Sequence, residues 1–115
     1  MKVYRGRRLA EGCAVTVDGD PLDPRADLEG PSGTAFEWGY AGAGPGRLAL
    51  AILAEHFRND GRALVDWRRF QGAVISMLPD DEWTLDSAAI DQALEGVIDV
   101  PLTLAELLNK VRGLR

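Results

Sequence analysis

The sequence predicts an α+β fold, in which a small N-terminal antiparallel sheet of about three strands packs on three to four helices. The N-terminal third places short runs of β-branched and aromatic residues between turn residues, a pattern typical of hairpins. The rest of the chain spaces its apolar residues three and four apart, as helices with one buried face do. With 115 residues, the chain is long enough for one hydrophobic core and too short for two. We therefore expect a single globular domain over residues 1–115.

Three short strands are expected in the N-terminal third. Residues 2–5 and 14–17 are rich in β-branched and aromatic side chains, and RGRR at 5–8 suggests a turn with a basic flank between them. Residues 21–33 repeat Pro, Asp and Gly without periodicity, which predicts a loop. The third strand is expected over 35–38, where two aromatic residues alternate with a glutamate.

The most informative stretch runs from residue 34 to residue 57 and reads TAFEWGYAGAGPGRLALAILAEHF. It predicts a glycine-rich turn and then a helix over about 45–57, because proline is favoured in the first turn of a helix. Apolar residues occupy several faces of this helix, and a helix that is apolar all round belongs in the centre of a domain. The triplet Asn59-Asp60-Gly61 follows, and its glycine suits a C-terminal cap.

Further helices are expected in the C-terminal half. Residues 63–78 place apolar side chains at three- and four-residue spacing, and Pro79 follows them. A charged loop at 80–82 leads to a helix that starts near Asp86, a favoured N-cap residue. A last helix is expected from Thr103, where TLAE matches a capping box.

The composition is that of a soluble globular protein, with 46% hydrophobic and 27% charged residues. The longest apolar run, residues 48–54, is far shorter than the roughly 20 residues that span a bilayer. The first residues contain no secretory signal. One cysteine and one histidine, Cys13 and His56, cannot assemble a zinc site of the usual kind. We therefore expect a cytoplasmic protein without membrane contact, metal or cofactor.

The glycine-rich turn before the central helix is a candidate anion-binding site. Gly42, Gly44 and Gly46 would let backbone N–H groups approach a phosphate at the positive helix N-terminus, with Arg47 beside them. The spacing departs from known phosphate loops, since Pro45 stands where a Walker lysine belongs and no Ser or Thr follows. The other interpretation is a tight turn whose glycines allow a buried helix to pack closely.

Charge is distributed unevenly along the chain, whose net charge is −5. Residues 1–69 are balanced, whereas residues 70–109 contain eight acidic residues and no Lys or Arg. Such a block would repel a nucleic-acid backbone and suits a basic protein surface. The candidate partner-binding residues are seven of its carboxylates, namely Asp80, Asp81, Glu82, Asp86, Asp91, Glu95 and Asp99. The other interpretation is an ordinary solvated face.

No catalytic residue is assigned from the sequence. A serine triad would need His56, and none of the serines has the context of a nucleophile elbow. An enzyme that uses Glu37, Tyr40 and His56 is the weakest hypothesis, because nothing in the sequence fixes their geometry.

FEWGYAGAGP at residues 36–45, followed by LALAIL at 48–53, resembles the signature of a small bacterial family of unknown function. The early Tyr4-Arg5-Gly6-Arg7 and the later Leu78-Pro79 and Trp83-Thr84 fit the same pattern. The resemblance covers about residues 3–95, and we expect the chain to depart from the family after Gly96. It implies a compact single domain, often met on phages, plasmids and other mobile elements, and it carries no accepted catalytic residues.

Together these observations predict a non-enzymatic protein-interaction module of a mobile element, such as an anti-CRISPR-like inhibitor of a host defence complex. Its acidic surface would occupy a basic groove that normally holds nucleic acid, without binding nucleic acid directly. The second hypothesis is a small-ligand or nucleotide-binding domain that uses the glycine turn and Arg47.

Overall fold

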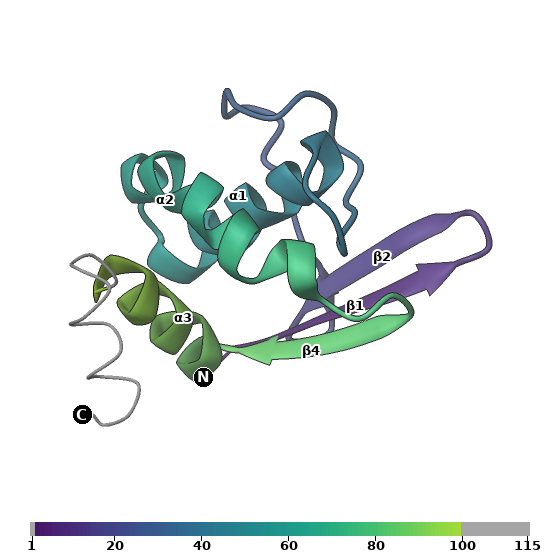
Figure 1. The fold of residues 1–115 in the computed structure, drawn as a ribbon. Coiled ribbons are helices and arrows are strands. Elements are labelled where there is room, and N and C mark those ends of the chain that lie inside the picture. The colour runs from purple at the N-terminus through teal and green to yellow at the C-terminus, as the bar shows by residue number, and fades with distance from the viewer. Residues whose placement is uncertain (1, 100–115) are drawn as a thin grey trace.

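The α+β class is confirmed by the computed structural model, which describes residues 2–99 and contains a four-stranded antiparallel sheet and three α-helices there. The strands are β1 (Val3–Leu9), β2 (Gly12–Val17), β3 (Asp20–Pro21) and β4 (Glu82–Asp86), in the order β3-β2-β1-β4. The helices are α1 (Ala43–Phe57), α2 (Asp60–Ala73) and α3 (Ser87–Asp99), with a 3-10 turn η1 at Ile75–Met77. Figure 1 shows the helices gathered on one side of the twisted sheet, with α3 following directly on β4.

Burial alternates along the strands, so the sheet has a covered face and an open face. Tyr4, Val15 and Trp83 are buried on the covered face, where they join the main hydrophobic core. The residues between them point to the opposite face, and Arg5 and Thr84 are exposed there. An antiparallel sheet with one solvated face is a common arrangement.

Two of the three predicted strands are confirmed, since 2–5 lies largely in β1 and 14–17 lies in β2. The predicted turn at 5–8 is wrong, because β1 continues to Leu9 and pairs with β2 from Tyr4 to Leu9. The predicted strand at 35–38 is also wrong. Residues 35–38 have no regular secondary structure, and the N–H of Gly39, directly after them, donates to the carbonyl of Ile75 in η1 at 3.0 Å.

The second neighbour of β1 is β4, which the sequence interpretation assigned to a charged loop and the start of a helix. The acidic residues Glu82 and Asp86 at its two ends favoured that interpretation. Trp83 and Leu85 alternate with polar residues between them, as expected for a strand with one covered face.

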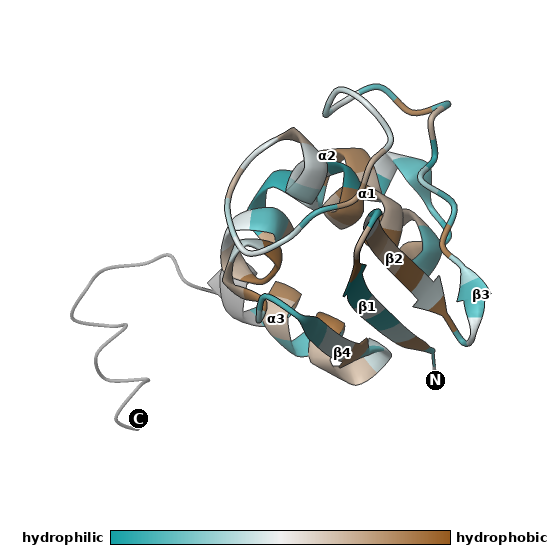
Figure 2. Ribbon diagram, turned by 90° about the vertical axis from the view of Figure 1, so that its right-hand side faces the viewer, coloured by the Kyte–Doolittle hydropathy of each residue, from teal (hydrophilic) through white to brown (hydrophobic). Residues whose placement is uncertain are grey.

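Helix α1 is the buried centre of the fold, as predicted. Every residue from Pro45 to Ala54 is buried. Gly46 permits this packing, because a Cβ atom there would lie only 2.9 Å from Trp67 of α2 and 2.8 Å from Pro31 of the preceding loop. Figure 2 shows apolar residues concentrated on α1 and β2.

Helix α2 begins at Asp60, earlier than the predicted residue 63. The Asn59 side chain accepts a hydrogen bond from the N–H of Arg62 at 3.1 Å, which makes it an N-cap. Arg58, in the left-handed conformation with φ 52°, ends α1 in place of the predicted glycine, and Gly61 therefore lies inside α2.

Helix α3 begins directly after Asp86, as predicted. The Asp86 carboxylate accepts a hydrogen bond from the N–H of Ala89 at 2.8 Å and so caps the helix. Ile90 and Leu94 of α3 are buried in the core. The helix predicted from Thr103 lies outside the described residues.

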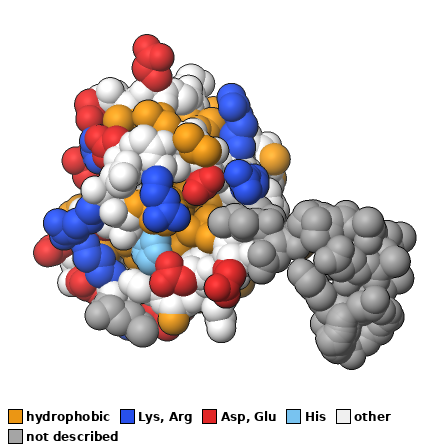
Figure 3. Space-filling view, turned by 90° about the vertical axis from the view of Figure 1, so that its left-hand side faces the viewer, with side chains coloured by type: hydrophobic (Ala, Val, Ile, Leu, Met, Phe, Trp, Pro, Cys, Tyr) orange, Lys and Arg blue, Asp and Glu red, His pale blue; other side chains and the backbone are white. Residues whose placement is uncertain are grey.

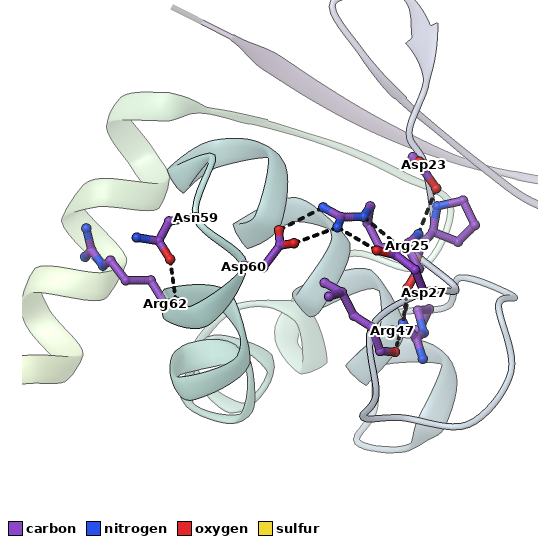
Figure 4. Close-up of polar contacts among 9 residues, drawn as sticks. Asp23, Arg25, Asp27, Arg47, Asn59, Asp60 and Arg62 are labelled. Atoms are coloured by element: carbon purple, nitrogen blue, oxygen red, sulfur yellow. Dashed lines mark hydrogen bonds and ion pairs between the residues drawn. The ribbon is translucent and has the colours of Figure 1, made fainter.

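Side chains of α1 and α2 make polar contacts with the loop between β3 and α1, as Figure 4 shows. Arg25 of this loop donates to both carboxylate oxygens of Asp60, at 3.0 and 2.8 Å, and makes a second ion pair with Asp27. Arg47 of α1 donates to backbone carbonyls of the same loop. These contacts hold the predicted 21–33 loop in a defined conformation.

Candidate functional site

A pocket of about 470 Å³ lies where the turn after Trp38 meets the start of β4. It is lined by Arg8, Glu37, Trp38, Gly39, Tyr40, Leu78 and Asp80. Its volume falls in the range of small-molecule and peptide pockets. Segments that are far apart in the sequence therefore meet at the FEWGY run.

Arg8 is the central side chain of this pocket. Its Nη1 donates to Oε1 of Glu37 at 2.9 Å, and its Nη2 lies 3.3 Å from Oδ1 of Asp80. Its Nε also donates to the Asp80 carbonyl at 3.0 Å, and the guanidinium lies over the Trp38 ring at 4.9 Å from the centroid. The hydrogen bond from Arg8 lowers the pKa of the Glu37 carboxyl below its ordinary value. Arg8 is thus held by several partners at once.

Cys13 lies beside the same ion pair, with Nη1 of Arg8 donating to its Sγ at 3.4 Å. The pKa of the Cys13 thiol is raised, first because burial disfavours the thiolate and then because the Glu37 carboxylate is near. A thiol with a raised pKa is a poor nucleophile at neutral pH.

Trp38 fixes the inner wall of the pocket. Its side chain is fully buried, and its Nε1 donates to the Asp80 carbonyl at 3.0 Å. Its ring meets that of Trp83 edge to face, with centroids 5.5 Å apart. Trp38 therefore joins the FEWGY turn to the chain that enters β4.

The mouth of the pocket is exposed and combines an aromatic ring with carboxylates. Tyr40 is 51% exposed, and the Asp80 side chain is 85% exposed although it pairs with Arg8. Asp81 and Glu82 follow directly and are exposed as well. We call Tyr40, Asp80, Asp81 and Glu82 the rim. Solvent-facing groups of this kind suit recognition of another molecule.

The structure separates the seven predicted partner-binding carboxylates. Asp80, Asp81 and Glu82 belong to the rim, at the opposite end of β4 from α3. Asp86 is half-buried and caps α3. Asp91 lies 2.7 Å from Nε2 of His56, Glu95 is exposed in the same region, and the side chain of Asp99 is outside the described part of the structure.

The glycine turn and the Arg47 guanidinium, which together form the alternative anion-binding set, do not come together in one site. Arg47 is only 4% exposed, and its donors reach five carbonyl oxygens of the preceding loop. The Gly42 carbonyl accepts hydrogen bonds from Gly46 N–H and from the Gln71 side chain, while Gly44 packs on Glu37. These contacts match the packing interpretation of the turn, and they direct the guanidinium away from it.

Glu37, Tyr40 and His56 do not converge. Glu37 and Tyr40 line the pocket described above, whereas His56 lines a separate hollow of about 690 Å³ with Phe57, Arg62, Asp91, Leu94 and Glu95. Figure 3 shows that face, with the histidine between acidic and basic side chains. His56 pairs with Asp91 of α3.

Two classes of site find no support in the described part of the chain. Among residues 2–99, no three His, Cys, Asp or Glu side chains come together in a group able to hold a metal ion. No helix in that range is long and apolar enough to cross a membrane.

The sequence interpretation missed Arg8 as a site residue because it placed residues 5–8 in a turn. A signal was nevertheless present. If the strand is extended to Leu9, the two-residue period puts Arg8 on the same face as buried Tyr4 and Gly6. A charged residue on a covered face requires partners, and Glu37 and Asp80 are those partners.

The chain belongs to a family of unknown function, DUF6166, whose match extends over residues 4–96. This range agrees with the resemblance to a family of unknown function over about residues 3–95, and it contains the whole pocket and rim. No curated protein and no solved structure matches the chain.

Proposed function

We propose that this member of DUF6166 is a non-enzymatic protein-interaction module that binds a basic partner surface at its rim. The observation that supports this most is the exposure of Tyr40 and Asp80 at the mouth of one pocket whose inner wall is the buried Trp38, with the exposed Asp81 and Glu82 following Asp80 along the chain. An aromatic ring and carboxylates side by side are the groups that receive Lys and Arg, through the ring face and through ion pairs.

The charge state of the rim favours a basic partner. Within residues 2–99, Asp81 and Glu82 make no ion pair, and Asp80 pairs only with Arg8. Unpaired carboxylates next to one another attract a positively charged surface and raise its association rate. Asp91 and Glu95 lie outside this rim. The acidic surface that we propose to bind the partner is therefore the one at the N-terminal end of β4.

The groups in the pocket support binding over catalysis. The guanidinium of Arg8 is engaged by Glu37, Asp80 and the ring of Trp38. The Cys13 thiol has a raised pKa, and His56 lies in another hollow. An acid–base pair or an activated nucleophile needs a free group within hydrogen-bonding reach of a substrate.

The finer proposal concerns the partner. We place it among nucleic-acid-binding complexes in the host cytoplasm, with the protein serving a phage- or plasmid-type mobile element as an anti-CRISPR-like inhibitor. Its support is the rim chemistry, because carboxylates compete with phosphates for the same Arg and Lys side chains, and the resemblance of the FEWGYAGAGP run to a family met on mobile elements.

The test compares two variants that reverse equal charge at different places. Asp81→Lys/Glu82→Lys changes the rim, whereas Glu29→Lys/Glu95→Lys changes exposed carboxylates elsewhere. Binding to a panel of purified nucleic-acid-binding complexes is measured at physiological salt, with and without their nucleic acid. We expect the rim variant to bind about tenfold more weakly or worse, the control to bind normally, and added nucleic acid to displace the protein. Equal losses for both variants, or unchanged binding by the rim variant, would refute a role of the rim.

A further inference from the structure

We propose that the open face of the sheet carries a second site, which binds a phosphate monoester of a small molecule through Arg5 and Arg7. Both arginines belong to β1, the strand between β2 and β4. This face lies opposite the helices and is separate from the pocket at Arg8, which points to the covered side. Neither arginine belongs to the rim, and Glu82 is the one residue that the rim shares with the lining of this face.

The strand register sets the geometry of this site. Arg5 lies directly across from Thr16 of β2 on one side and from Thr84 of β4 on the other. Arg7 follows two residues later, about 7 Å along the strand, and points the same way. The two guanidinium groups and the two hydroxyl groups therefore share one surface. Arginine forks and hydroxyl groups are common ligands of phosphate oxygens.

Among the arginines of residues 2–99, Arg5 and Arg7 are the ones without a partner in that range. Arg8, Arg25, Arg58 and Arg69 form ion pairs with carboxylates, and Arg47 donates to carbonyls. Arg62 and Arg68 lie over aromatic rings at 3.9 and 4.9 Å. Glu82 lies across from Arg7 without forming an ion pair with it, and Arg5 faces threonines on both sides. The two adjacent guanidinium groups repel each other, and an anion between them would offset that repulsion.

The surface around these arginines is hollowed on both sides. One hollow of about 410 Å³ is lined by Arg5, Gly6, Arg7, Glu82, Trp83 and Thr84. A second hollow of about 310 Å³ is lined by Arg5, Arg7, Leu9, Ala14 and Thr16. Both fall in the size range of small-ligand sites.

The same face disfavours larger occupants. The residues on it include no aromatic side chain for base stacking, so a nucleic-acid strand would find no stacking platform there. Three strands of this length offer roughly 300 Å² of surface, well below the roughly 800 Å² per partner of a stable dimer. A small ligand with a dianionic phosphate fits the charge and the area.

The test is a titration of the labelled protein with inorganic phosphate and with glycerol phosphate, at constant ionic strength in chloride, followed by NMR. We expect saturable shifts of the backbone amides of Arg5, Arg7 and Thr84. Arg5→Gln/Arg7→Gln should weaken binding at least about tenfold, and Arg5→Lys/Arg7→Lys should give an intermediate loss, because lysine keeps the charge but not the fork.

Arg68→Gln/Arg69→Gln is the matched control, since it removes the same charge from α2 and should leave binding within about twofold. Thermal unfolding verifies that the variants are folded, as expected for exposed side chains. Equal weakening in the control, or shifts that do not saturate, would show non-specific attraction and overturn the site. Tighter binding of an oligothymidylate than of glycerol phosphate would assign the face to nucleic acid and overturn the small-molecule proposal.

Discussion

Glu37 and Arg8 are 29 residues apart in the sequence and form an ion pair of 2.9 Å between Oε1 and Nη1. The pair joins β1 to the FEWGY turn, and each side chain is about a third exposed. The same arginine also bonds to the Asp80 carbonyl, so it links β1 to the segment that leads into β4. The guanidinium of Arg8 therefore helps to position the rim, together with Trp38, whose Nε1 donates to the same carbonyl.

The first prediction concerns acid stability. The native pKa of Glu37 is lowered from its ordinary value of 4.5, so its ion pair stabilises the fold fully above about pH 4.5 and loses its effect as the pH falls through the lowered value. Glu37→Gln should lower the free energy of unfolding by at most about 1 kcal/mol at pH 7, because solvent screens a partly exposed pair. Denaturant unfolding at pH 7 and at pH 3 checks this, and the difference from the unmodified protein should shrink at the lower pH.

A matched control for this prediction is Glu11→Gln, which removes the same charge from an exposed position at the β1–β2 turn. It should leave the free energy of unfolding nearly unchanged at both pH values. A pH-independent cost of Glu37→Gln would mean that packing, and not charge, accounts for the effect.

The second prediction concerns Trp38, whose fully buried ring packs against Trp83. Trp38→Ala should destabilise the fold by about 4 kcal/mol, because it leaves a large cavity. Trp38→Phe keeps much of the volume but leaves the Asp80 carbonyl without the Nε1 donor, and it should cost about 1–2 kcal/mol. Thermal or denaturant unfolding measures both. Equal losses for the two variants would show that the hydrogen bond matters as much as the ring.

The helical part of the fold was largely predictable because its signals are local. Pro45 and the apolar run after it predict a buried helix, and Asp86 is a strong N-cap by its chemistry alone. The start of α2 differs from the predicted one because Asn59 acts as an N-cap, whereas Gly61 suggested the end of the preceding helix. The choice between two such local signals is decided by packing of the whole chain.

The sheet and the pocket were less predictable because both depend on contacts between distant segments. β4 pairs with β1 across about eighty residues, and its acidic ends resemble a loop when the partner strand is not known. Likewise, the buried position of Arg47 follows from loop carbonyls that converge only in the folded chain. The acidic block of the sequence forms two separate groups in space, the rim carboxylates and those of α3, because β4 lies between them.

The third prediction concerns Gly6, which lies opposite Trp83 in the β1–β4 pair. A Cβ atom at Gly6 would lie 2.2 Å from the Trp83 ring, so Gly6→Ala must displace a buried indole and should cost about 2–3 kcal/mol. Gly72 of α2 has no neighbouring atom within 4 Å of such a Cβ, so Gly72→Ala should be neutral or stabilise the fold by up to about 1 kcal/mol. The two variants make the same chemical change, and only Gly6→Ala should lower the unfolding midpoint. A neutral Gly6→Ala would contradict the close packing of Trp83.

The last prediction concerns Arg47, which holds the loop between β3 and α1 by hydrogen bonds to its carbonyls. Arg47→Met keeps the length of the side chain but leaves buried carbonyl oxygens without donors, and it should cost about 3 kcal/mol. Because the substitution removes the hydrogen bonds that hold the loop and leaves those of the sheet in place, limited proteolysis should cut first within residues 24–33. Arg68→Met removes an equal charge from an exposed position on α2 and should change neither stability nor the cleavage pattern. If Arg47→Met remained as stable and as resistant as the unmodified protein, and bound phosphate less well, Arg47 would belong to an anion site and not to the scaffold of the loop.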